Sequence, residues 1–168
     1  RPNGPERPHI LNRLELRICD LVGNVDLLLA ITALLELRII NLKNNRKKYD
    51  PMEASSKNCT QLAQMSDEND IKAAKYSLEA NLSHWENGTQ IKCRNWIREL
   101  LADVTPLAKE LDMLDLLKPI ESVLTNGNQA MIWLDCYSKG SSIQSLLQKG
   151  IGEMEQQETN FIQMNSTY

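Results

Sequence analysis

The N-terminal part of the chain carries a strict alternation of charged and aliphatic residues. The alternation lies within residues Ile10–Cys19 and covers six consecutive positions. Successive side chains of a β-strand point to opposite faces of its sheet, so this period of two predicts a strand with one apolar and one charged face. The apolar face carries Leu14, Leu16 and Ile18. The charged face carries Arg13, Glu15 and Arg17.

From Val25 onward, apolar residues recur every three or four positions, which is the spacing of one face of an α-helix. The first helix has Asn24 as its N-cap, is apolar around most of its circumference and is expected to be largely buried. The second has an expected inner face of Ile71, Ala74, Leu78, Leu82 and Trp85. The expected helices are Val25–Asn44, 66–86, Ile91–Val104, 105–117, Pro119–Leu124, Gln129–Tyr137 and 141–156.

Local signals set the expected helix ends. Ser66 is predicted to cap the second helix, and Thr105-Pro106 is predicted to end one helix and begin the next, because proline suits a first helical turn. Ser141 and Gln144 have the spacing of a capping box for the last helix. A polar connection containing Pro51 is expected between Asn44 and Asn58, and a frayed polar tail beyond Gln156.

These elements predict a mainly α chain of about seven helices and one N-terminal strand. A single strand cannot satisfy its own backbone groups, so we expect its neighbours in an antiparallel sheet formed largely by an upstream part that precedes Arg1, which would make the full protein α+β. The expected organisation is a loop and strand of the catalytic sheet at 1–20, a C-terminal helical region at 21–158 and a flexible tail at 159–168.

The charge and hydropathy of the chain argue against two classes of protein, those that bind nucleic acid and those that cross a membrane. A net charge of −3 and a pI near 5.5 argue against a nucleic-acid surface, which needs clustered positive charge. The basic run Arg46-Lys47-Lys48 is interpreted as the solvated end of a helix. The most apolar run, 27–35, is too short and too interrupted to cross a bilayer, and no signal peptide is visible.

The four cysteines leave two interpretations open. Cys19, Cys59, Cys93 and Cys136 have no metal-binding spacing and are interpreted first as free thiols in a reducing compartment. Against this, N-x-S/T triplets occur at Asn58, Asn81, Asn87 and Asn165. With an even cysteine count, they keep a secreted, disulfide-containing helical bundle as an alternative.

The charged face of the predicted strand is the main candidate for chemistry. A carboxylate between two guanidiniums suits a site where the acid binds a cation and the arginines bind phosphate or carboxylate oxygens. The structural alternative is a half-solvated strand with mutually compensating salt bridges. The sequence contains no P-loop, nucleophile elbow or dinucleotide fingerprint.

The order of motifs resembles the C-terminal region of bacterial carboxylate-amine ligases of the glutamine synthetase superfamily. It is most similar to the cyanobacterial type of glutamate–cysteine ligase, over about Pro8 to Glu158. The N-terminal motif is Arg-x-Glu-x-Arg at 13–17, followed by Asp20 and an Ala/Leu-rich helix. The downstream matches are Asn69, Ala73, Leu78, Ala80, Gly88, Trp96-Ile97-x-Glu99-Leu100-Leu101, Pro106-Leu107-Ala108 and Gly127-Asn128-Gln129-Ala130.

The resemblance implies an ATP- and Mg²⁺-dependent cytoplasmic enzyme that joins L-glutamate to L-cysteine through a γ-glutamyl phosphate, the first step of glutathione biosynthesis. By motif, Glu15 would bind Mg²⁺, and Arg13 and Arg17 would be catalytic and contact the nucleotide phosphate and the glutamyl group. The implied protein partners are the remainder of the same enzyme and, in a possible homodimer, a second copy of it. The resemblance implies binding to neither nucleic acid nor a membrane.

The chain also departs from that family, because it contains no candidates for the further metal-binding carboxylates or the nucleotide pocket. Asp20 is the only other acid close to the motif in sequence. We therefore expect this chain alone to be an incomplete catalytic unit. The competing hypothesis is a non-enzymatic helical module that binds a partner helix in a groove.

Overall fold

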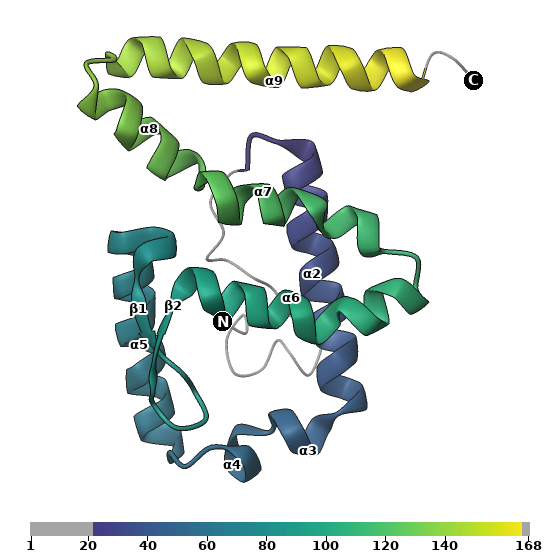
Figure 1. Cartoon of the computed structure of the whole chain (residues 1–168), viewed down its shortest axis with the longest axis vertical. Helices are drawn as coiled ribbons and strands as arrows, with labels where there is room; N and C mark the ends of the chain where they lie inside the picture. Colours follow the sequence, from purple (N-terminus) through teal and green to yellow (C-terminus); the bar gives the residue numbers. More distant parts are fainter. Residues whose placement is uncertain (1–21, 166–168) are drawn as a thin grey trace, which may run out of the picture.

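A long central helix, α2 (Val25–Asn44), organises the part of the chain that the structure, a computed structural model, describes, residues 22–165. Asn24 caps it, since its side chain accepts a hydrogen bond from the backbone N–H of Leu27 at 2.8 Å. Figure 1 shows α2 crossed by two further helices, α6 (Cys93–Glu110) and α7 (Lys118–Asn126). A 3₁₀ turn, η2 (Leu114–Leu117), connects these two and also packs on α2.

The core lies where α2, α6, η2 and α7 meet. Small residues on α2 allow the other helices to approach closely, and aliphatic residues from the crossing helices fill the space. Its most deeply buried large side chains are Leu37, Val104 and Leu124. The other buried members are Ala30, Ala33, Leu78, Leu101, Ala108, Leu117 and Ile120.

A second layer flanks α6 and consists of one helix and a short hairpin. Helix α5 (Cys59–Tyr76) leads through the 3₁₀ turn η1 (Ser77–Glu79) into strand β1 (Asn81–Ser83). Strand β2 (Gln90–Lys92) pairs with β1 in antiparallel register, with Leu82 opposite Ile91, and runs directly into α6. Two four-residue helices, α3 (Arg46–Tyr49) and α4 (Pro51–Ala54), connect α2 to α5.

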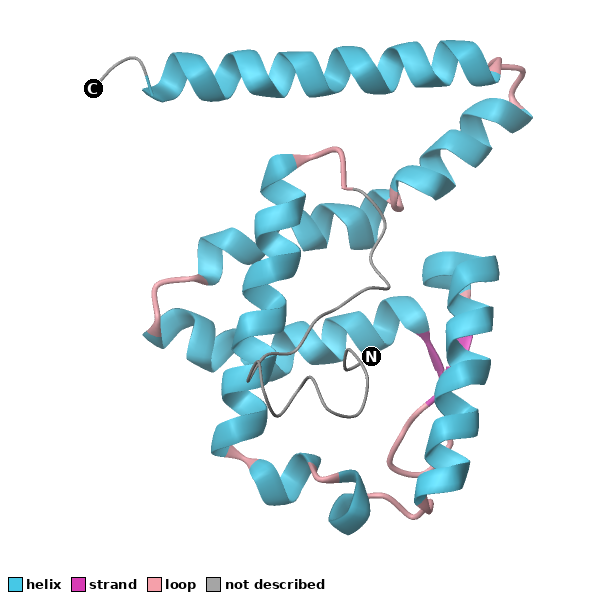
Figure 2. Cartoon of the chain, turned by 180° about the vertical axis from the view of Figure 1, so that it is seen from behind, coloured by secondary structure: helices cyan, strands magenta, loops and turns pink. Residues whose placement is uncertain are grey.

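The C-terminal helices extend away from the core. Helix α8 (Gln129–Ser138) leads to α9 (Ile143–Asn165), which lies across one end of the molecule in both views (Figures 1 and 2). Leu146 of α9 is buried, and Trp133 of α8 packs over Gly150. Within residues 22–165, no helix combines the length and the apolar character that a membrane crossing requires.

The mainly helical class is confirmed, and the first helix has the predicted bounds and cap. The prediction that this helix is largely buried is wrong for the described structure, because only Ala30, Ala33 and Leu37 of α2 are buried. The predicted strand 10–19 lies outside the described residues, so its sheet stays a prediction.

The predicted helix 66–86 is wrong at both ends. Helix α5 starts seven residues earlier, at Cys59, because Asn58 and Gln61 form a capping box in which each side chain bonds the other's backbone. It ends at Tyr76, and the chain then turns into the hairpin. The expected inner face is confirmed in part: Leu78 and Leu82 are buried, although they lie beyond the end of the helix, whereas Ile71 is 69% exposed.

The predicted break at Thr105-Pro106 is wrong as well, because α6 continues through Pro106 to Glu110. The buried positions Val104 and Ala108 lie on both sides of the proline, so packing against α2 holds the two halves in one helix. Pro106 itself is on the exposed side. At the C-terminus, α9 continues to Asn165, beyond the predicted end at Gln156.

Candidate functional site

The residues predicted from sequence to carry chemistry, Arg13, Glu15 and Arg17, lie outside the described residues. Their arrangement and roles therefore stay predictions. The described part of the chain offers two polar or hollow features beside the core: a pocket between α5 and the hairpin, and a charged cluster that joins α2, α3 and α6.

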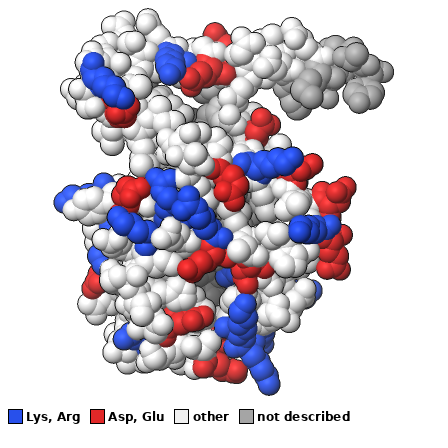
Figure 3. All heavy atoms as spheres, in the orientation of Figure 1, with Lys and Arg blue, Asp and Glu red and all other residues white. Residues whose placement is uncertain are grey.

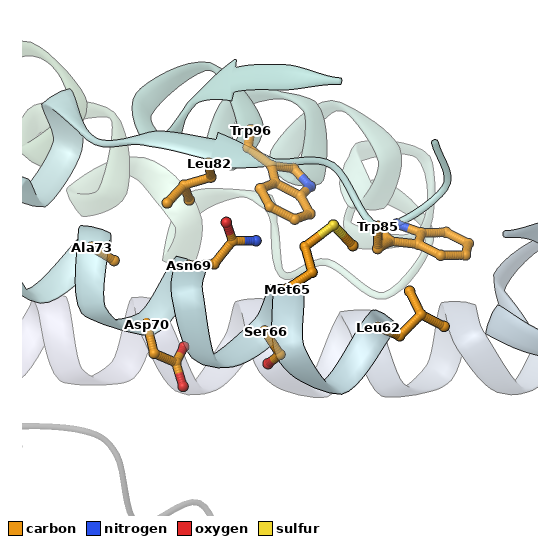
Figure 4. Close-up of a pocket in the computed structure, with 9 residues that line it drawn as sticks. All are labelled: Leu62, Met65, Ser66, Asn69, Asp70, Ala73, Leu82, Trp85 and Trp96. Carbon is orange, nitrogen blue, oxygen red and sulfur yellow. The ribbon is translucent and has the colours of Figure 1, made fainter. Parts of the chain in front are cut away.

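The pocket has a volume of about 270 Å³, slightly below the usual range for small-molecule sites. Figure 4 shows Met65 and Asn69 pointing from α5 toward Trp96, whereas the side chain of Asp70 points away. The lining residues are Leu62, Met65, Ser66, Asn69, Asp70, Ala73, Leu82, Trp85 and Trp96. The wall is thus mainly apolar and aromatic.

Asn69 is the polar side chain that points into this pocket, and its amide is already used. The amide nitrogen donates to the backbone carbonyl of Ser83 at 2.9 Å, and the amide oxygen accepts from the backbone N–H of Ser83 at 2.8 Å. This paired bond fixes β1 against α5, and the acid among the lining residues, Asp70, is directed away from the pocket (Figure 4). Asn69, Ala73 and Trp96, which carried part of the sequence resemblance, therefore meet here as a packing unit.

The charged cluster is centred on Asp103 of α6. One carboxylate oxygen accepts from Arg38 of α2 at 2.5 Å, from Asn41 at 3.0 Å and from the hydroxyl of Tyr49. The other carboxylate oxygen accepts from Lys48 at 3.0 Å. The ring of Tyr49 lies between two cations, with Arg38 at 4.8 Å and Lys48 at 4.7 Å from its centroid.

Electrostatics keep Asp103 ionised. Partial burial alone raises the pKa of Asp103, but the hydrogen bond from Tyr49 and the two neighbouring cations outweigh it and hold the pKa below the usual range of an aspartate. Every donor in the cluster is directed at this carboxylate. The cluster therefore acts as a clamp that fixes α3 and the end of α2 against α6, rather than as an open binding site.

Replacing Asp103 by Asn is expected to lower the free energy of unfolding by about 1–3 kcal/mol at pH 7, because charge-assisted hydrogen bonds are lost and two cations remain together. The folded-state pKa of Asp103 is depressed, so this stabilisation is present above the unfolded pKa of about 3.9 and disappears as the pH falls through the folded value. Urea unfolding at pH 7 and at pH 3 measures the difference, which should shrink at pH 3.

The matched control is Asp115→Asn, because the ion pair of Asp115 with Lys118 is exposed at 84% and 75% of the two side chains. Its effect should stay below about 0.5 kcal/mol at both pH values. A loss for Asp103→Asn that is equal at pH 7 and pH 3 would contradict the role of the ionised carboxylate.

Sequence reasoning missed these long-range polar contacts. Arg94 donates to the backbone carbonyl of Leu124 at the end of α7 and pairs with Glu79 at 2.8 Å. The two partners of Arg94 lie 15 and 30 residues away in sequence, so no local pattern indicates them.

Two further kinds of site could support chemistry among the described residues: a metal site and, at Cys93, an activated thiol. Among residues 22–165, no group of three or more His, Cys, Asp or Glu side chains is placed to hold a metal ion. Burial raises the pKa of the Cys93 thiol despite the neighbouring Arg94, so the thiol stays protonated at neutral pH. Cys59, Cys93 and Cys136 are free, so no disulfide joins them.

The surface seen in Figure 3 has acidic and basic side chains interspersed over the body of the molecule. This face therefore has no broad region of a single charge that would suit a polyanionic partner. The bonds beside the pocket and the cluster around Asp103 both fix helices and strands against one another, so we call the described region a scaffold.

Comparison with known proteins shows which family this chain belongs to. The model of glutamate-cysteine ligase family 2 (GCS2) matches residues 1–156. A Solibacter usitatus (strain Ellin6076) protein named "Putative glutamate–cysteine ligase 2" is 25% identical over 150 residues, which cover 89% of this chain and 37% of that relative. The chain thus spans little more than a third of this relative's length. No solved structure matches it significantly. The family match covers the predicted strand motif, α2 to α8 and most of α9, and on this basis the chain belongs to glutamate-cysteine ligase family 2.

Proposed function

We propose that this chain is the C-terminal part of a cytoplasmic, ATP-dependent glutamate–cysteine ligase that makes γ-glutamylcysteine, the first product of glutathione biosynthesis. The family match over residues 1–156 supports the proposal most directly. The cyanobacterial-type resemblance of the motifs is part of the proposal. The substrates would be L-glutamate, L-cysteine and ATP.

The proposed reaction has two steps. The side-chain carboxylate of glutamate attacks the terminal phosphorus of ATP, which releases ADP and forms a γ-glutamyl phosphate. The amine of cysteine then attacks the acyl carbon, loses a proton and displaces inorganic phosphate. Both steps develop negative charge on phosphoryl or acyl oxygens, so positioning and electrostatic neutralisation supply most of the catalysis.

The proposed site residues suit this chemistry. Guanidinium groups at Arg13 and Arg17 would bind the nucleotide phosphate and the glutamyl group in bidentate fashion. Glu15 supplies the hard oxygen donor that Mg²⁺ prefers; one or two carboxylates together with substrate phosphates are its usual protein ligands. Bound there, the ion would neutralise phosphate charge. The nucleotide pocket and the other carboxylates would come from the rest of the enzyme.

The test is a turnover assay on the full-length protein that contains this chain. We expect ADP release that requires glutamate, ATP, Mg²⁺ and an amine, with cysteine as the preferred amine. A panel of other amino acids and simple amines separates this reaction from that of a ligase with another acceptor. No ADP release with glutamate and any amine would reject the proposal and favour the non-enzymatic helical module.

A further inference from the structure

Helix α2 has a second apolar face that the described structure leaves uncovered. Its buried residues, Ala30 among them, face α6 and α7. Ile39 follows Ala30 by nine residues, or two and a half turns, and so points to the opposite side of the helix. There Leu28 is 48% exposed and Ile39 is 52% exposed. We call the exposed apolar residues of this side the outer stripe of α2: Val25, Leu28, Ile39 and Leu42.

The outer stripe consists of one exposed apolar pair near each end of α2, and between the two pairs the same side carries the half-buried Leu35 and the exposed Thr32. Leu28 and Ile39 are eleven residues apart, almost a whole number of turns, so they lie along one line. Glu36 follows Val25 by the same eleven residues and therefore lies in line with Val25, along one edge of the stripe. A helix that is apolar on opposite sides is normally enclosed between two layers, and α2 has one of them in the described residues.

We propose that the segment Ile10–Cys19 of this chain covers the outer stripe, packing as a strand with Leu14, Leu16 and Ile18 against α2. The alternation of the segment supplies a complementary apolar face. This packing does not depend on any enzymatic activity. If the segment packs in this way, Arg13, Glu15 and Arg17 point away from α2. That they then face the substrates rests on the proposed function.

The short connection and the element lengths support this occupant. Residues 20–24 separate the segment from α2, and such a link spans at most about 20 Å, so the segment cannot move far from the helix. Ten residues of strand are about 33 Å long. The 20 residues of α2 are about 30 Å long, so a strand that runs back along the helix covers the whole stripe.

The direction of the chain sets the pairing. Because the segment precedes α2 and turns back after Cys19, its end lies near the start of the helix. Leu16 is then expected close to Leu28, and Leu14, two strand residues or about 7 Å farther along, close to Thr32, which follows Leu28 by four helix residues or about 6 Å. The charged triad would lie on the opposite face, where the remaining sheet of the full enzyme would continue. In this arrangement α2 is the platform that orients the triad.

Paired cysteines in the full-length protein test the proposal, after the four native cysteines of this chain, and any others in the full-length protein, are replaced by serine. One variant carries Leu16→Cys with Leu28→Cys, and its matched control carries Glu15→Cys with Leu28→Cys. The cysteines at positions 16 and 15 are neighbours along the segment, but they lie on opposite faces of the predicted strand. With a short bismaleimide reagent, we expect intramolecular crosslinking at least roughly tenfold faster for Leu16 than for Glu15, because reach depends on the direction of the side chain.

A second set, Leu14→Cys or Arg13→Cys with Thr32→Cys, repeats the comparison if the first pair does not fold. Far-ultraviolet circular dichroism and the thermal midpoint identify folded variants. Equal rates for the two faces, or no intramolecular product in either set, would overturn the proposal. Crosslinks between chains would assign the outer stripe to a second copy and would overturn it too. Because the readout is crosslinking rather than turnover, its failure is distinguishable from failure of the proposed ligase activity.

Discussion

If the proposed ligase activity is correct, replacing Glu15 by Gln is expected to reduce the turnover of the full-length protein by a factor of about 10² or more, with little change in stability. Gln keeps the shape of Glu but removes the negative charge that would hold Mg²⁺ beside the nucleotide. Charge neutralisation matters most when phosphoryl oxygens gain charge, so kcat should fall more than the affinity for cysteine. Steady-state ADP release at several Mg²⁺ concentrations measures the effect.

The matched control for Glu15→Gln is Glu155→Gln on α9, an exposed position far from the predicted strand in sequence. This control should keep the turnover of the parent protein and its dependence on Mg²⁺. Unchanged turnover in Glu15→Gln would reject the assignment of Glu15 as a metal ligand. A similar loss in both variants would point to a general effect of charge instead.

The sequence is most informative where local signals and packing agree. The helix Val25–Asn44 combines a clear cap at Asn24 with an apolar period, and the structure has these bounds. The hairpin was not predictable in the same way, because its strands have three residues each and Leu82 continues the helical spacing of the preceding segment. The long-range bond between Asn69 and Ser83, rather than local propensity, fixes β1 there.

Two other errors have physical causes that local sequence hides. The rule that proline ends a helix ignores the buried residues on both sides of Pro106, whose packing offsets a loss of up to about 3 kcal/mol. The capping box at Asn58 was visible in principle, since Gln61 stands three residues later. It competed with Ser66, which also has cap chemistry followed by acids, and only the fold distinguishes the two positions.

The candidate functional residues also fall into one group that a local sequence pattern predicts and one group that it does not. The charged triad is a local pattern, so sequence predicts it, and its placement remains to be tested by the crosslinking and Glu15→Gln experiments. The clamp around Asp103 joins residues 54 to 65 positions apart, from Tyr49 and Arg38, and no sequence period links them. Such contacts become visible only once α2, α3 and α6 are in place.

Truncating Leu37 to Ala is expected to lower the free energy of unfolding by about 2–5 kcal/mol, a large share of the 5–15 kcal/mol typical of a protein domain. Leu37 is fully buried on α2 and belongs to the core cluster that also contains Val104 and Leu124. Removing its branched end leaves a cavity between rigid helices, which cannot close without moving α6 or α7. Chemical denaturation of the chain, followed by circular dichroism, measures the loss.

The matched control is Leu134→Ala on α8, the same chemical change at a side chain that is 68% exposed. It should change the unfolding free energy by less than about 0.5 kcal/mol, because little buried apolar surface is lost. Equal effects at Leu37 and Leu134 would contradict a core centred on α2. If Leu37→Ala also abolishes the faster crosslinking of Leu16 to Leu28, then the core side of α2 must be packed before its outer stripe can hold the predicted strand. The helix would then transmit stability from the core to the segment that carries Arg13, Glu15 and Arg17.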